Sequence, residues 1–225
     1  MFKTSLAAGA FALLTLVSGS LPAYAAGTAS TVPAVPVQVA APAATISPTE
    51  SAALQYMREE EKLAHDVYVA LYAKWNLQIF SNIAASEQKH TDSILTLLNR
   101  YGVSDPAAGK AAGVFTNPDL QALYTTLVAQ GSVSTVEALK VGAAIEELDI
   151  LDLKTHIAET TKPDILRVHN NLLSGSQSHL RSFTATLTTL TGTAYEPQYL
   201  EPADYAAIAS GQTGAQFVFI PSITR

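Results

Sequence analysis

The sequence predicts an all-α protein, a four-helix bundle with one long crossover connection and an irregular C-terminal tail. Three observations predict this fold. Four long segments place apolar residues at three- and four-residue steps, the spacing that forms one buried stripe on a helix. Capping serines and terminal glycines mark the ends of these segments. A stretch rich in glycine and proline separates the second segment from the third, and it is long enough to connect two helical hairpins.

The composition limits the classes of function. The 225 residues are enough for one helical domain of ordinary size together with tails. A formal net charge of −6 provides no basic patch, so we expect no binding to nucleic acid. The chain contains no cysteine, which excludes disulfides, thiolate metal sites and cysteine nucleophiles. A bound metal would therefore be held by oxygen and imidazole ligands.

Residues 1–25 are typical of a secretory signal peptide. Lys3 supplies the positive charge, the run from Leu6 to Val17 is apolar, and Ala23-Tyr24-Ala25 is a small-x-small cleavage motif. An uncleaved anchor is the alternative, but the run is shorter than the roughly 20 residues that a membrane-spanning helix needs. We expect cleavage, a periplasmic or secreted mature protein, and no membrane association after cleavage.

Residues 26–46, rich in alanine and proline, are predicted to be a linker. The first helix is predicted from Pro48 to Trp75, because Ser47 and Glu50 form a capping box around a proline at the first helical position. Glu61 falls inside the apolar stripe of this helix, which consists of Leu54, Met57, Ala64, Tyr68, Leu71 and Trp75.

The second helix is predicted from Ser81 to Tyr101, with its end at Gly102, and Glu87 and His90 share its apolar face. The crossover follows, over residues 103–131. We expect it to contain only a short helix, from Asp119 to Ala129.

The third helix is predicted to begin after a second capping box, Ser134 and Glu137, and to run to Glu159, with Glu146 in a gap of its apolar stripe. The fourth is predicted from Pro163 to just before Gly192, with His179 beside its stripe. The bundle domain would thus span residues 47–192. The C-terminal extension, 193–225, is expected to be irregular, with a short strand at residues 217–220.

Acids within an apolar stripe indicate a site, because burying an ionised carboxylate costs several kcal/mol unless it is paired or binds a metal. Glu87 and His90 are spaced i, i+3, which points both side chains at one spot, as in carboxylate-bridged di-metal bundles. Glu61 and Glu146 come from other helices. The alternative is a polar network in which carboxylates hydrogen-bond to histidines without a metal.

Several neighbouring residues remain open in this interpretation. Glu60 and Glu147 each lie one residue, a rotation of about 100°, from a candidate ligand. His65, one turn after Glu61, is either a ligand, an outer partner or a half-exposed structural histidine. Tyr68 is interpreted as core packing rather than as a redox residue. His156 and His169 are assigned to structure, and Asp152 and Glu159 to a solvated face.

The segments 59–68, 175–180 and 195–199 resemble a bacterial and archaeal ferritin-like domain family of uncharacterised function. The resemblance covers about residues 47–199 and implies a ferritin-like four-helix bundle. Carried over by position, it implies these metal ligands: Glu61, Glu87, His90, Glu146, Asp149 and His179. Asp149 would resemble the second acid of this helix in rubrerythrin-like sites. The chain departs from the standard pattern at Ser176, where a second Glu-x-x-His motif would have a carboxylate.

We therefore expect an exported metal-binding protein, and, if it is an enzyme, a non-haem metal oxidoreductase acting on oxygen, peroxide or ferrous ion. Iron, mononuclear or dinuclear, is the first expectation for the cofactor, and manganese or zinc are the alternatives. The competing hypothesis is a non-enzymatic bundle that stores or senses metal, or an interaction module with a polar core. The sequence leaves the oligomeric state open, with a dimer compatible with the pattern.

Overall fold

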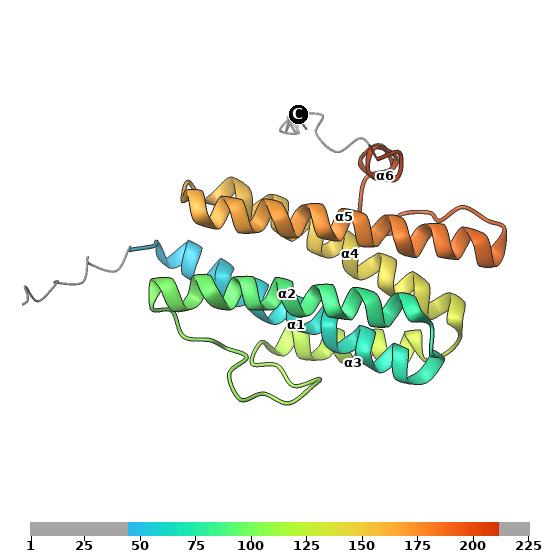
Figure 1. Cartoon of the computed structure of the whole chain (residues 1–225), viewed down its shortest axis with the longest axis horizontal. Helices are drawn as coiled ribbons and strands as arrows, with labels where there is room; N and C mark the ends of the chain where they lie inside the picture. The colour runs from blue at the N-terminus through green and yellow to red at the C-terminus, as the bar shows by residue number, and fades with distance from the viewer. Residues whose placement is uncertain (1–44, 212–225) are drawn as a thin grey trace, which may run out of the picture. The chain divides into compact units, whose positions relative to one another are not determined.

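The computed structural model describes residues 45–211, and within that range the chain forms helices and no strands (Figure 1). The signal peptide, nearly all of the linker and the strand expected at residues 217–220 lie outside the described residues. None of the helices between residues 45 and 211 is both long and apolar enough to cross a bilayer. In chain order the helices are α1 (Pro48–Trp75), α2 (Gln78–Tyr101), α3 (Pro118–Gly131), α4 (Thr135–Glu159), α5 (Pro163–Thr191) and α6 (Pro202–Ala209).

The four long helices form two hairpins. Helices α1 and α2 are joined by two residues and pack along their length, and α4 and α5 pair in the same way after a three-residue connection (Figure 1). Contacts of α1 with α4 and of α2 with α5 bring the hairpins together. The crossover from α2 to α4 contains α3, which packs against α1 and α4. The predicted order of two helices, a crossover and two helices is confirmed.

The helix ends follow the capping chemistry in most places. Ser47 and Glu50 form the expected capping box, and α2 and α5 end at glycines with φ of 67° and 72°. The second expected capping box is only half formed, because Ser134 caps Glu137 but the Glu137 carboxylate contacts Lys140 and Gln130. Helix α2 begins three residues earlier than predicted, at Gln78, since its N-cap residue makes no side-chain bond that would mark it.

The interior of the described chain contains two apolar clusters. One surrounds the aromatic side chains of Tyr68, Phe80 and Phe183, whose ring centroids lie 5.3 to 6.1 Å apart. The other is built around Met57 and Ile94 toward the opposite ends of the same helices. Between the clusters, the helices contribute a layer of buried acids and histidines. This layer holds the candidate site.

The C-terminal extension is not wholly irregular, which corrects the prediction. It contains α6, which packs against α5, and its preceding loop is attached to α4 by Glu147. The Glu147 carboxylate accepts hydrogen bonds from the backbone amides of Gln198, Tyr199 and Leu200 and from the hydroxyl of Tyr195. The loop therefore has a buried anchor that its sequence pattern did not reveal.

Candidate metal centre

Glu87 lies at the centre of the polar layer, between two histidines. It is 1% exposed, and its two carboxylate oxygens face different imidazoles. Oε2 lies 2.7 Å from Nδ1 of His90, one turn further along α2. Oε1 lies 2.7 Å from Nδ1 of His179 on α5. One carboxylate thus connects two halves of a site, and the rings of His90 and His179 stack with centroids 5.6 Å apart.

Each half is completed by one further glutamate. Oε2 of Glu61, on α1, lies 3.3 Å from Nδ1 of His90. Oε2 of Glu146, on α4, lies 3.5 Å from Nδ1 of His179. The ligand atoms of Glu61, Glu87 and His90 all lie within 4.8 Å of one another, as do those of Glu87, Glu146 and His179. Either group could hold a metal ion, and Glu87 belongs to both.

The histidine nitrogens are unsatisfied in a way that suits a metal. Nδ1 of His90 and Nδ1 of His179 have no hydrogen-bond partner among residues 45–211, although a carboxylate oxygen lies 2.7 Å from each. Buried oxygens of Glu61 and Glu87 are also without partners. Buried polar atoms that converge without bonding to one another are completed by a cation placed between them.

The electrostatics of this layer require positive charge. Burial raises the pKa of Glu61 to about 8, and burial together with the charge of Glu87 raises the pKa of Glu146. Burial also opposes charge on Glu87, but its contacts with His179 and His90 lower the pKa of this carboxyl. The pKa values of both histidines are raised, because the carboxylate contacts outweigh burial. Protons on the imidazoles therefore supply positive charge that a metal ion would replace.

Tyr68 belongs to the surroundings of the site as well as to the core. Its ring is fully buried, and its hydroxyl donates a 2.6 Å hydrogen bond to Oε1 of Glu146. This bond fixes one oxygen of Glu146 and leaves the other facing His179. The sequence favours core packing over a redox role for Tyr68 and does not identify its bond to Glu146. The seven-residue, two-turn spacing from Glu61 places it on the same helix face and could have indicated this role.

Helix α5 contributes one member of the site, His179. Ser176, where a second carboxylate would stand, is fully buried and donates a hydrogen bond to Oδ2 of Asp149. Asp149 is itself 5% exposed and lies outside both three-residue groups. Of the six residues predicted as ligands, the structure thus brings five into the two groups and places Asp149 beside them.

Within each pair of adjacent glutamates, 60–61 and 146–147, the two side chains have different partners. Glu61 and Glu146 lie in the groups, whereas Glu60 and Glu147 do not. Glu147 anchors the C-terminal loop, as described above. Glu59, the first of three consecutive glutamates, accepts hydrogen bonds from the backbone amides of residues 116 and 117 and so attaches the crossover to α1.

The remaining histidines lie outside the groups. His65 is partly exposed, and its Nδ1 lies 2.9 Å from Oδ1 of Asp66. His156 contacts Glu159 and the ring of Tyr56. His169 is fully buried, and its pKa is lowered to about 4 by burial. The structural roles predicted for His156 and His169 stay predictions.

Comparisons with known proteins match this chain to a family. A family model described as an uncharacterized protein domain, DUF2202, matches residues 50–212. The uncharacterized protein MJ0754 of Methanocaldococcus jannaschii is 49% identical over 172 residues, which cover 76% of this chain and 92% of that protein. The crystal structure of the hypothetical protein MJ0754 from Methanococcus jannaschii DSM 2661 matches with a TM-score of 0.73 and 48% identity, covering 76% of this chain and 98% of that one. These descriptions assign no activity.

Proposed function

We propose that this chain, which belongs to the DUF2202 family of uncharacterized protein domains, is a ferritin-like metal protein that holds two metal ions, one on each side of Glu87. The observation that carries the proposal is the position of Glu87 between two histidines whose facing nitrogens are unsatisfied. One ion would be held by Glu61, Glu87 and His90. The other would be held by Glu87, Glu146 and His179.

Charge supports two ions. The carboxylates of Glu61, Glu87, Glu146 and Asp149 are all at most 5% exposed and carry four negative charges when ionised. Two divalent ions balance that charge, and repulsion between the ions is reduced by the shared carboxylate. Asp149 compensates in charge for the acid that Ser176 replaces, and the Ser176 hydroxyl holds it beside the site.

The donor set is compatible with iron, manganese or zinc. Carboxylate oxygens and imidazole nitrogens suit all three ions, and the described site offers no sulfur ligand. Three protein ligands for each ion leave positions for an external ligand. Iron in such a site supplies redox chemistry toward oxygen or peroxide. The protein holds the ligands in place, with Tyr68 fixing Glu146, while the apolar clusters on both sides limit the access of water.

The experiment that tests this function is metal analysis of the purified mature chain, followed by an oxidation assay. We expect bound iron, manganese or zinc in the wild type, its complete loss in Glu87→Ala and the loss of one ion in His90→Ala. His65→Ala is the matched control, because His65 lies on α1 near the site but outside both groups. Metal retained in all variants would contradict the proposal.

Catalysis and storage are separated by a second measurement on the same samples. If the protein is an oxidoreductase, it consumes oxygen or peroxide when ferrous ion is added, and Glu87→Ala does not. A protein that binds metal without consuming either oxidant is a container or sensor, and the catalytic part of the proposal is then wrong.

We also propose that the protein is exported, on the basis of residues 1–25. Expression of the full chain followed by N-terminal sequencing tests this. Mature protein that begins near Ala26 supports export with cleavage, whereas an intact N-terminus contradicts it.

A further inference from the structure

A row of acids leads from the metal centre toward the surface along the seam between α1 and α4. On α4, Glu146, Asp149 and Asp152 follow one another at three-residue steps. Each step turns about 60° around the helix, because a helix repeats every 3.6 residues. The exposed fraction of the residues rises along the row, from 1% at Glu146 and 5% at Asp149 to a partly exposed Asp152.

Glu60 on α1 connects this row across the seam. Burial raises the pKa of its carboxyl group, and the neighbouring acids Asp149 and Asp152 raise it further. The charge that acts most strongly on Asp149 is in turn that of Glu61, a ligand in the proposed centre. The row of acids therefore runs from Asp152 through Glu60 and Asp149 to Glu61 in the proposed centre.

Two buried oxygens in the row have nothing to bind. Oε2 of Glu60 and Oδ1 of Asp149 have no hydrogen-bond partner among residues 45–211, and both residues are more than nine-tenths buried. Leaving carboxylate oxygens buried without partners costs free energy, and a cation that passes between them supplies the missing interaction. Within the described residues no third group of ligands suited to holding an ion is present at this position. The row thus fits passage better than storage.

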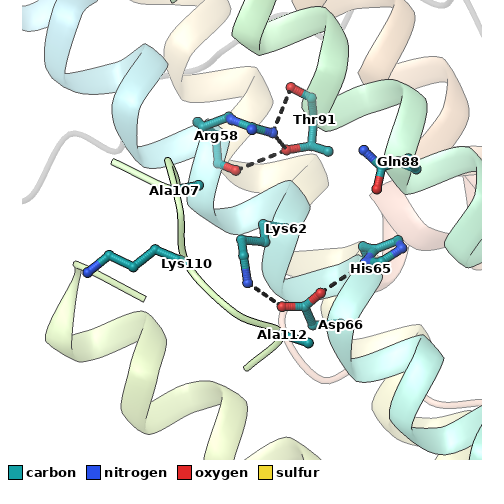
Figure 2. A pocket seen from close by; sticks show the side chains of 9 residues that line it. All are labelled: Arg58, Lys62, His65, Asp66, Gln88, Thr91, Ala107, Lys110 and Ala112. Atoms are coloured by element: carbon teal, nitrogen blue, oxygen red, sulfur yellow. Dashed lines mark hydrogen bonds and ion pairs between the residues drawn. The ribbon is translucent and has the colours of Figure 1, made fainter. Parts of the chain in front are cut away.

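The outer end of the row is connected to a surface hollow through Tyr56. Tyr56 lines this hollow together with His156 and Glu159, and the Tyr56 hydroxyl donates a 3.1 Å hydrogen bond to Asp152. A second hollow lies between α1, α2 and the crossover. Figure 2 shows Arg58, Lys62 and Lys110 lining it together with Asp66. Arg58 and Lys62 are paired with Asp105 and Asp66, and Lys110 adds a positive charge that disfavours cations there, so the acidic seam is the favoured approach.

We propose that the acids between α1 and α4 form the entry route by which divalent cations reach the metal centre. Asp152 receives the ion from the surface hollow, and Glu60 and Asp149 pass it inward to the shared ligands. This inference rests on the proposed metal-binding function. It assigns Glu60, Asp149 and Asp152 a transport role that is separate from final coordination.

The test compares the rate of metal uptake with its equilibrium. Co²⁺ is mixed with metal-free full-length protein in a stopped-flow instrument, and visible absorption reports binding. We expect Glu60→Gln to slow loading by about tenfold, the lower range of what a field of one sign contributes to association rates. The number of Co²⁺ ions bound at equilibrium and their affinity stay as in the wild type. Loading of the wild type slows with added salt, because the outer acid of the row, Asp152, is partly exposed.

Two controls keep the test informative. Asp152→Asn changes a partly exposed side chain, so it reports on the route if the buried Glu60→Gln variant fails to fold. Glu137→Gln removes the same charge from the surface of α4 and is expected to load at the wild-type rate.

Several outcomes would overturn the inference. These are unchanged rates in both Glu60→Gln and Asp152→Asn, a Glu60→Gln variant that binds fewer ions at equilibrium, or faster loading in Lys110→Gln without any effect of Glu60→Gln. The second outcome would make Glu60 a ligand, and the third would place the entry at the hollow in Figure 2. A wild type that binds no Co²⁺ at all would instead contradict the proposed function.

Discussion

Gly175 lies against the ring of His90: a Cβ atom built on Gly175 would stand 2.7 Å from both Cε1 and Nε2 of that imidazole. Real Cβ atoms do not approach other atoms this closely, so an alanine at this position must displace the ring. Gly175 is in the interior of α5, where glycine costs about 0.5–1 kcal/mol relative to alanine. Glycine at this position therefore lowers the stability of the helix but leaves space for the ring of His90, a candidate metal ligand.

Gly175→Ala should accordingly separate metal binding from helix stability. We expect affinity for the ion at His90 to fall by about 10- to 100-fold, the range seen when the support of a metal ligand is disturbed. Co²⁺ titration measures this loss. The metal-free variant should be as stable as the metal-free wild type in thermal unfolding, because alanine favours the helix. Unchanged Co²⁺ affinity would show that the ring has another position from which it binds.

Tyr68→Phe should weaken the other half of the site. The variant removes the 2.6 Å hydrogen bond to Glu146 and leaves the rest of the aromatic cluster in place. We expect affinity at the Glu146 position to fall about tenfold and the free energy of unfolding of the metal-free protein to fall by about 1 kcal/mol. Tyr72→Phe, one turn further along α1, is the control. Equal Co²⁺ affinities in the two variants would refute the role given to the Tyr68 hydroxyl.

Glu146 and Glu147 should respond differently to the same substitution. Glu146→Gln is expected to lose one metal ion and keep the C-terminal loop in place. Glu147→Gln is expected to keep both ions but to lower the free energy of unfolding by about 2 kcal/mol, since a buried charge with several donors is lost. Hydrogen exchange at the amides of residues 198–200 reports the loop directly. Protected amides in Glu147→Gln would contradict the anchoring role.

Metal binding should release protons and strengthen as pH rises. Burial opposes charge on both imidazoles, but neighbouring carboxylates raise the pKa of His90 to about 11 and that of His179 to about 10. Both rings thus carry protons at neutral pH in the metal-free protein, and a metal must displace them. In the metal-free protein, the raised histidine pKa values stabilise the folded state. This stabilisation is complete at pH values below about 6.5, the pKa of histidine in the unfolded chain, and it is lost as the pH rises through the pKa values of the folded protein.

Calorimetry in buffers of different ionisation enthalpy measures this proton release. We expect a net release on Co²⁺ binding at pH 7 and a tighter apparent affinity at pH 8 than at pH 6. Binding that takes up protons, or that is independent of pH, would show that the histidines are not ligands.

The long helices could be predicted from the sequence because their signals are local. Helix α1 begins and ends where expected, at Pro48 and Trp75, because its cap and apolar spacing are contained within the segment. Helix α6 was missed since it has eight residues, lies among prolines and glycine, and buries only Ile208. So short a helix has no periodic stripe that a sequence pattern can register.

The partners of the acids could not be predicted from local pattern. Glu59, Glu60 and Glu61 are consecutive and all buried, yet they face the crossover, the α4 seam and the metal centre respectively. Helix geometry predicts that such neighbours point in different directions, but it does not identify the residues that each side chain contacts. The backbone amides that bind Glu59 come from far along the chain. Asp152, expected on a solvated face, is partly buried against Tyr56 for the same reason.

The shared position of Glu87 provides the most direct test of the proposed centre. Metal-free wild type and the variants Glu87→Ala, Glu61→Ala and Glu146→Ala are titrated with Co²⁺, and bound metal is counted after dialysis. The account predicts two ions in the wild type, one in each of the outer variants and none in Glu87→Ala, because only Glu87 belongs to both groups. Two ions retained by Glu87→Ala, or none bound by the wild type, would contradict it.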